Sequence, residues 1–255
     1  MGLLLWRDTI EKLKRTGALL VHYTSEFFGF RSYLYRHFLK SIALYHVHVI
    51  TNELIIPKLR ENGAKKVVLT EFGYDPVYQC PDQGSQGVEK DYRSDAVFIG
   101  HWEPTTQRNI EGLINAKVDV SVWGSHWRWR ALKMKGNHMI RPIEREDYPK
   151  MIASSKIGLG FLSKWNKNQS AGRIFEIPAL GSFLLAERTQ QNTSYFKEGV
   201  EADFFSSREE LIEKAKYYLE HDDQRSAIAQ AGHKRCMASP YTIKDRVEKM
   251  MTDIE

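Results

Sequence analysis

The sequence predicts an α/β protein with two domains, each built around a parallel β-sheet. Short apolar runs rich in Val and Ile alternate with segments of helical periodicity, a pattern typical of β-α units. The stretch 76–94 gathers Pro, Gly, Asp and Gln without periodicity, which is typical of a linker. We therefore expect domains over 1–75 and 95–240, with a last helix over 241–255 that packs back toward the first domain.

The first domain is expected to contain three strands. A helix precedes them over 3–15 and ends at Gly17, where the helical spacing of Leu and Ile stops. The expected strands cover 18–23, 47–51 and 66–70, and the helices between them cover about 31–43 and 57–62.

The second domain is expected to continue the alternation of strands and helices. Its apolar runs predict strands over 96–100, 118–123, 139–142, 157–162 and 183–186. Helical periodicity is expected over 110–115, 148–154, 207–220, 224–237 and 243–254, and a short helix is expected from Arg173.

The composition is that of a soluble globular protein. Hydrophobic residues make up 42% and charged residues 27%, so neither disorder nor a fibrous class is favoured. The net charge of +5 suits an anionic ligand or a membrane surface, and without a block of five like charges a nucleic-acid tail is unsupported. Cys80 and Cys236 have no metal-ligand spacing and indicate free thiols. Arg7 and Asp8 come too early for a secretory signal, and no apolar run is long enough to span a membrane, so we expect a cytoplasmic protein.

The segment 170–187 is the strongest candidate for a binding site. Arg173 and Glu176 are three residues apart and share a helix face. Ser170 and Gly172 allow close approach of a phosphate to a helix N-terminus, and an arginine fork fits phosphate oxygens. A glutamate accepts hydrogen bonds from a ribose diol, so the pattern predicts a nucleoside diphosphate site. The alternative is an ordinary ion pair on a solvated helix face.

The resemblance to a known family is carried by several short motifs in order. Residues 95–236 resemble the nucleotide-binding half of a GT-B glycosyltransferase, specifically the bacterial CgeB-like group among the group 1 glycosyl transferases. The motifs are D-A-V-F-I-G at 95–100, V-S-V-W-G at 120–124, K-I-G-L-G-F at 156–161, R-I-F-E-I-P-A-L-G at 173–181, E-G-V-E-A-D-F-F at 198–205 and I-A-Q-A-G at 228–232.

This resemblance implies two Rossmann-like domains, of which the N-terminal one is incomplete. Such proteins usually have six or more strands in that half, whereas three are expected here. Either the chain is N-terminally truncated or its acceptor domain is unusually small.

The resemblance also implies a set of donor-binding residues. Glu176 matches the second acid of the family's E-x7-E motif, whereas Asn168 stands at the first position. Trp127 and Trp129 have two roles open to them, stacking on a base or sugar and covering the core. The expected donor-nucleotide site comprises Gly100, His101, Arg108, Gly124, Arg141, Ile143, Ser170, Arg173 and Glu176.

The expected activity is transfer of a hexosyl group from a nucleotide-diphosphate sugar to a glycan or protein acceptor at the cell surface or on a spore. No D-x-D triplet is present, so we expect neither a metal nor another cofactor. His22 and Glu26 are candidate bases from the first domain, although a structural role for each is also open.

Other classes of function remain open from the sequence. The main alternative is a truncated, non-catalytic module that binds a nucleotide or a protein, and an exposed sheet edge would favour a homo-oligomer. Peripheral membrane contact is also open. Nucleic-acid binding through the basic stretch 31–40 has the least support and is not expected.

Overall fold

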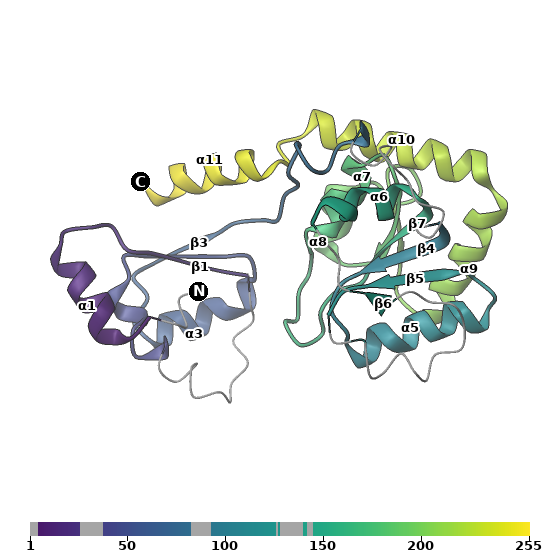
Figure 1. Ribbon diagram of the computed structural model, residues 1–255. Coiled ribbons are helices and arrows are strands. Elements are labelled where there is room, and N and C mark those ends of the chain that lie inside the picture. The colour runs from purple at the N-terminus through teal and green to yellow at the C-terminus, as the bar shows by residue number, and fades with distance from the viewer. Residues whose placement is uncertain (1–4, 26–37, 83–92, 126, 128–139, 142–144) are drawn as a thin grey trace. The chain divides into compact units, whose positions relative to one another are not determined.

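The computed structural model describes residues 5–25, 38–82, 93–125, 127, 140–141 and 145–255 (Figure 1). The α/β class and the two parallel sheets are confirmed. The chain forms two compact units, of which the first comprises Met1–Phe72, Ser163–Asn168 and Ile243–Glu255 and the second comprises Gly73–Leu162 and Gln169–Thr242. The sequence placed 163–168 in the second domain, but this segment belongs to the first unit.

The first unit is built on a parallel sheet in the order β1-β2-β3. Its strands are β1 (Val21–Thr24), β2 (Val47–Ile50) and β3 (Lys66–Leu69). The helices α1 (Arg7–Arg15) and α3 (Ile56–Glu61) contribute Ile10 and Leu59 to one buried cluster, which also contains Ile42 and Ile50. Among the described residues, this cluster is larger than the one formed by Val47, Val49 and Val68.

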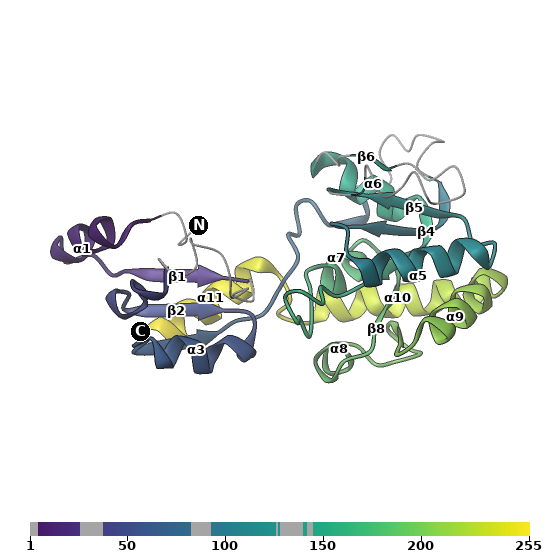
Figure 2. The same cartoon turned by 90° about the horizontal axis from the view of Figure 1, so that it is seen from below.

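The last helix, α11 (Ile243–Ile254), belongs to the first unit (Figure 2). Its Met250 and Ile254 pack against the buried valines of β2 and β3. Lys66 Nζ donates to the Ile254 carbonyl oxygen at 2.6 Å, and Arg246 pairs with Glu71 at 2.5 Å. These contacts join the C-terminal helix to β3 and to the residues just after it, within one unit.

The second unit is built on a six-stranded sheet with the order β6-β5-β4-β7-β8-β9, and each neighbouring pair is parallel. Hydrogen bonds in the sheet align Ala96 with Val120 on one side and with Ile157 on the other. The strands are β4 (Ser94–Ile99), β5 (Val120–Trp123), β6 (Ile140–Arg141), β7 (Ser155–Gly160), β8 (Phe183–Glu187) and β9 (Asp203–Phe205).

Helices cover both faces of this sheet (Figure 1). On one face, α5 (Pro104–Asn115) and α9 (Arg208–Glu220) pack with Ile157 and Leu159 in the main apolar cluster. On the other face lies α7 (Arg173–Ala179), and a Cβ at Gly158 would stand 2.6 Å from the Ile177 side chain. The glycine therefore lets α7 pack directly on β7. The remaining helices are α6 (Tyr148–Ala153), α8 (Gln190–Tyr195) and α10 (Asp222–Ala238).

Three elements differ from the sequence expectation. Helix α5 begins at Pro104, six residues earlier than expected. Its first turn is polar and shows no apolar period, so the sequence pattern did not indicate it. Strand β9 (Asp203–Phe205) was not among the strands expected from the sequence, because three residues are too few to show an alternation. Helix α8 was not predicted; Thr189 caps it by accepting a hydrogen bond from the Asn192 amide.

Candidate functional site

The strand order of the six-stranded sheet reverses between β4 and β7. From β4 the chain continues to β5 on one side of the sheet, whereas β7 lies on the other side. In an open parallel sheet, ligands bind at the carboxyl ends of the strands where the order reverses. The end of β4 at Ile99 and the end of β7 at Gly160 therefore mark the expected ligand position.

Arg173 lies across this switch point. Its Nη1 donates to the Ile99 carbonyl oxygen at 2.8 Å, and its Nη2 donates to the Phe161 carbonyl oxygen at 3.2 Å. The guanidinium carbon lies 5.2 Å from the centre of the Phe98 ring. The side chain thus joins the ends of the two central strands and places a positive charge there.

Glu176 is one turn further along α7 and is held by Tyr148. The Tyr148 hydroxyl donates to Glu176 Oε2 at 2.6 Å. Burial raises the pKa of Glu176, while this hydrogen bond and the charge of Arg173 act in the opposite direction. Arg173 and Glu176 form no ion pair with each other in the described structure, so the surface ion pair considered from the sequence is not what the fold contains.

The residues before α7 leave room for the Glu176 carboxylate. A Cβ at Gly172 would lie 2.9 Å from Glu176 Oε1, so any larger residue would displace this oxygen. Ser170 is only 3% exposed, and its hydroxyl has no hydrogen-bond partner among the described residues. A buried, unpaired hydroxyl is the kind of group that a ligand or a water molecule satisfies.

Gly100 and Gly124 pack against each other at the ends of β4 and β5. Gly124 has φ +127°, and a Cβ there would lie 2.3 Å from the Gly100 carbonyl oxygen. The Gly100 amide donates to Trp123, and its carbonyl accepts from Trp127 Nε1 at 2.8 Å. Trp127 is fully buried in the main apolar cluster, which favours its role as a core residue.

His101 and Arg108 follow β4, as the sequence implied, but neither contacts Arg173 or Glu176. His101 Nε2 lies 3.0 Å from Oε1 of the buried Glu103, the residue before α5. Arg108 is exposed on α5, and its Nη2 donates to Thr105 at 3.3 Å within the same helix.

The other predicted donor residues are described only in part. Arg141 is the last residue of β6, where it pairs with Trp123 of β5. Ile143 and Trp129 lie outside the described residues, as does Glu26. Asn168, at the position of the family's first acid, belongs to the first unit.

His22 is in the core of the first unit. Its side chain is 5% exposed, and its Nδ1 lies 3.2 Å from His48 Nδ1, beside the rings of Phe38 and Tyr45. Burial and the neighbouring His48 lower the pKa of His22 to about 3. This burial favours the structural alternative for His22, whose role as a base stays a prediction.

Sequence reasoning missed Tyr148. It is the first residue of α6, 28 residues from Glu176, and nothing in its local sequence connects the two. An aromatic residue at a helix start is an ordinary core signal. The pairing is visible only when the strand order is known.

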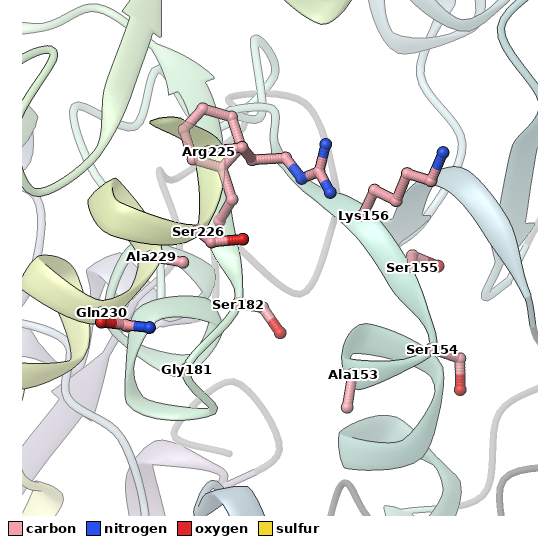
Figure 3. Close-up of a pocket in the computed structure, with 11 residues that line it drawn as sticks. Ala153, Ser154, Ser155, Lys156, Gly181, Ser182, Arg225, Ser226, Ala229 and Gln230 are labelled. Atoms are coloured by element: carbon pink, nitrogen blue, oxygen red, sulfur yellow. The ribbon is translucent and has the colours of Figure 1, made fainter. Parts of the chain in front are cut away.

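A hollow of about 410 Å³ lies at the opposite edge of the sheet from the switch point (Figure 3). It is lined by residues at the starts of β7 and β8 and by α10, with Lys156 and Arg225 directed to the same side. Lys156 lies 3.4 Å from Asp95, and Arg225 pairs with Asp222 at 2.5 Å. Because these carboxylates balance the two cations, the hollow is a weaker candidate for an anion site than the switch point.

Solved structures with this fold include several glycosyltransferases. HepE of Anabaena, in complex with UDP and glucose, is 12% identical with a TM-score of 0.68, covering 96% of this chain and 75% of HepE. Sucrose-phosphate synthase of Thermosynechococcus elongatus is 12% identical with a TM-score of 0.66, covering 97% and 71%. A TarM variant of S. aureus, in complex with fondaparinux, α-GlcNAc-glycerol and UDP, is 10% identical with a TM-score of 0.64, covering 92% of this chain but only 50% of TarM.

These likenesses define the fold as that of the GT-B glycosyltransferases, as the sequence motifs implied. The chain belongs to the glycosyl transferase-like family, whose sequence profile matches residues 105–252. No curated protein matches the sequence. In the part of the chain that the structure describes, no helix is both long and apolar enough to cross a membrane.

Proposed function

We propose that this protein transfers a hexosyl group from a nucleotide-diphosphate sugar to a glycan or protein acceptor. The observation that carries the proposal is the position of Arg173 and Glu176 at the carboxyl ends of β4 and β7. Family membership supports the class of reaction, and HepE and TarM, which share the fold, bind UDP.

In this proposal Arg173 stabilises the departing nucleoside diphosphate. Negative charge develops on the diphosphate as the bond from the anomeric carbon to its oxygen breaks and a new bond to the acceptor oxygen, which loses its proton, forms. A fixed positive charge lowers the energy of that state. Two guanidinium N–H groups are used on strand carbonyls, but each terminal nitrogen retains a second N–H that can face a ligand. Because the anchored guanidinium is already in place, little reorganisation is needed when the charge appears.

Glu176 has a different role, recognition of the ribose. One carboxylate oxygen is engaged by Tyr148, and the other lies over Gly172. We assign this second oxygen to a ribose hydroxyl, which donates a hydrogen bond to it. The buried Ser170 hydroxyl is a further donor or acceptor beside the diphosphate.

The proposal also includes expectations from the sequence that no finding tests. Transfer proceeds without a metal, since the sequence has no D-x-D triplet to hold a bridging divalent ion. The cytoplasm is the proposed compartment, in keeping with two free cysteines. Gly100, His101 and Arg108 remain proposed contacts of the donor.

Calorimetric titration with UDP, GDP, ADP and dTDP tests the proposal. We expect one nucleotide to bind the wild type, and Arg173→Ala and Glu176→Ala to weaken it at least tenfold. A protein that binds none of them at millimolar concentration, a regime of about 4 kcal/mol, would contradict the donor site. If a nucleotide binds but the matching nucleotide sugars are not turned over with any glycan or protein offered, the non-catalytic module becomes the better explanation.

A further inference from the structure

Glu176 is bound on one side only. Its Oε2 accepts the hydrogen bond from Tyr148, whereas Oε1 accepts none from the described residues and lies against the space that Gly172 leaves open. The nearby cation does not neutralise the carboxylate directly, because Arg173 donates to the carbonyls of Ile99 and Phe161 instead. A carboxylate held by one oxygen presents its other oxygen in a fixed direction.

The partner that holds this carboxylate is a phenol rather than a cation. A bidentate arginine would occupy both carboxylate oxygens, whereas one hydroxyl occupies a single lone pair and leaves the negative charge in place. The tyrosine is partly buried at the start of α6, where its neighbours Pro149 and Met151 are buried. The hydrogen bond to Glu176 therefore comes from a residue whose backbone is anchored in the core of the second unit.

We propose that Tyr148 is a positioning residue that orients Glu176, so that the donor site selects ribonucleotides over nucleotides without ribose hydroxyls. This inference rests on the proposed function and extends it to the sugar of the nucleotide. Tyr148 touches neither the donor nor the acceptor. It acts by fixing the free carboxylate oxygen and by keeping Glu176 ionised in a buried position.

The central experiment compares UDP with 2′,3′-dideoxy-UDP on the wild type and on Tyr148→Phe. We expect the wild type to bind UDP at least tenfold more tightly than the dideoxy compound. In Tyr148→Phe we expect UDP affinity to fall about tenfold and dideoxy-UDP affinity to stay within twofold of the wild type. In a Glu176→Ala background, which leaves Tyr148 no side-chain acceptor at position 176, Tyr148→Phe should have no further effect on the ratio between the two ligands.

A pH profile separates orientation from a general loss of structure. Within the described part of the chain, Tyr148 and Arg173 are the titratable or charged groups that act on the Glu176 carboxylate. Because the tyrosine hydrogen bond lowers the pKa of Glu176, its removal should move the acid limb of UDP binding to higher pH. A purely structural defect would weaken binding without moving that limb.

Tyr218→Phe is the matched control. Its hydroxyl donates to Asp203 Oδ2 at 2.8 Å, so this pair is also a buried tyrosine and a carboxylate in the second unit. We expect this variant to lose stability but to keep the UDP to dideoxy-UDP ratio. If Tyr148→Phe does not fold, 3-fluorotyrosine at position 148 keeps the hydroxyl, strengthens it as a donor, and should move the acid limb to lower pH.

The outcomes distinguish failure of this inference from failure of the proposed function on which it rests. If the wild type binds no UDP at millimolar concentration while another nucleotide binds, the same comparison with that nucleotide and its dideoxy analogue decides the matter. If no nucleotide binds, both the function and the inference fail. If UDP binds and Tyr148→Phe leaves both the ligand ratio and the acid limb unchanged, the role of Tyr148 is refuted while the donor site stands.

Discussion

Arg173 Nη1 donates to the Ile99 carbonyl oxygen at 2.8 Å, which joins the start of α7 to the end of β4 across 74 residues of sequence. The same guanidinium also bonds the Phe161 carbonyl after β7. One side chain therefore bridges the ends of the two central strands and places a positive charge there. Removing Arg173 would not separate its proposed binding role from its structural role, but replacing it with lysine would.

Arg173→Lys should weaken binding of the donor nucleotide about tenfold and lower the stability of the second unit by about 1–2 kcal/mol. Lysine keeps the charge but cannot bond both carbonyls in a planar fork. Titration with the nucleotide and urea unfolding measure the two effects. Arg208→Lys is the control, since Arg208 is exposed and pairs only with Glu209 among the described residues. Unchanged nucleotide affinity in Arg173→Lys would contradict the idea that binding requires the planar guanidinium group.

Glu176→Gln should make the second unit more stable at pH 7.5 and lose nucleotide affinity. Burial raises the pKa of Glu176 in the folded protein above its unfolded value, so its stabilising contribution is complete below the unfolded pKa. That contribution is lost as the pH rises through the folded pKa, because the ionised carboxylate is then buried. Glutamine keeps an acceptor for Tyr148 without the charge.

We expect a rise in the Tm of Glu176→Gln by about 2 °C or more at pH 7.5 and no difference from the wild type at pH 4. Thermal unfolding of the wild type and the variant at both pH values measures this difference in Tm. A variant that is less stable than the wild type at pH 7.5 would show that Tyr148 and Arg173 compensate the buried charge fully.

Acidification should destabilise the first unit through His22. Its pKa is lowered by burial to about 3, below the unfolded value, so the unfolded chain binds the proton first. The stability contribution is complete above about pH 6.5 and is lost as the pH falls from there toward 3. Burial also lowers the pKa of the neighbouring His48.

His22→Gln should flatten this pH dependence, because glutamine keeps a hydrogen-bonding side chain that does not titrate. Urea unfolding of the wild type and the variant at pH 7 and pH 5 provides the comparison. His221→Gln, a change at an exposed histidine of the second unit, should leave the dependence as it is. If the free energy of unfolding changes equally between pH 7 and pH 5 in the wild type and in His22→Gln, the acid sensitivity comes from groups other than His22.

Gly124→Ala should lower the free energy of unfolding of the second unit by at least about 2 kcal/mol and abolish nucleotide binding. The new Cβ would lie 2.3 Å from the Gly100 carbonyl oxygen, at a φ of +127°. Gly199→Ala is the matched control, because Gly199 has φ +71° and nothing within 4 Å of its Cβ position. Its cost should be about 1 kcal/mol, from backbone strain alone. Denaturant unfolding and titration with the nucleotide compare the two variants.

Much of the fold could be predicted because its strands and helices carry their own periodicity. The apolar runs of β2, β4 and β8 differ from the structure by at most two residues at either end. Segments without such a pattern were not predicted. Strand β9 has three residues, which cannot show an alternation, and the first turn of α5 is polar. Local pattern therefore predicted the elements but not their exact extent.

Local sequence was enough to predict that Arg173 and Glu176 share one helix next to a parallel sheet, because helical spacing and strand alternation are local properties. Their partners, in contrast, depend on the tertiary structure. Arg173 bonds carbonyls 74 and 12 residues away, Tyr148 reaches Glu176 across 28 residues, and His22 is buried against His48. These contacts depend on the order of the strands within each sheet, and strand order is set by the packing of the whole unit, which no local spacing of residues encodes.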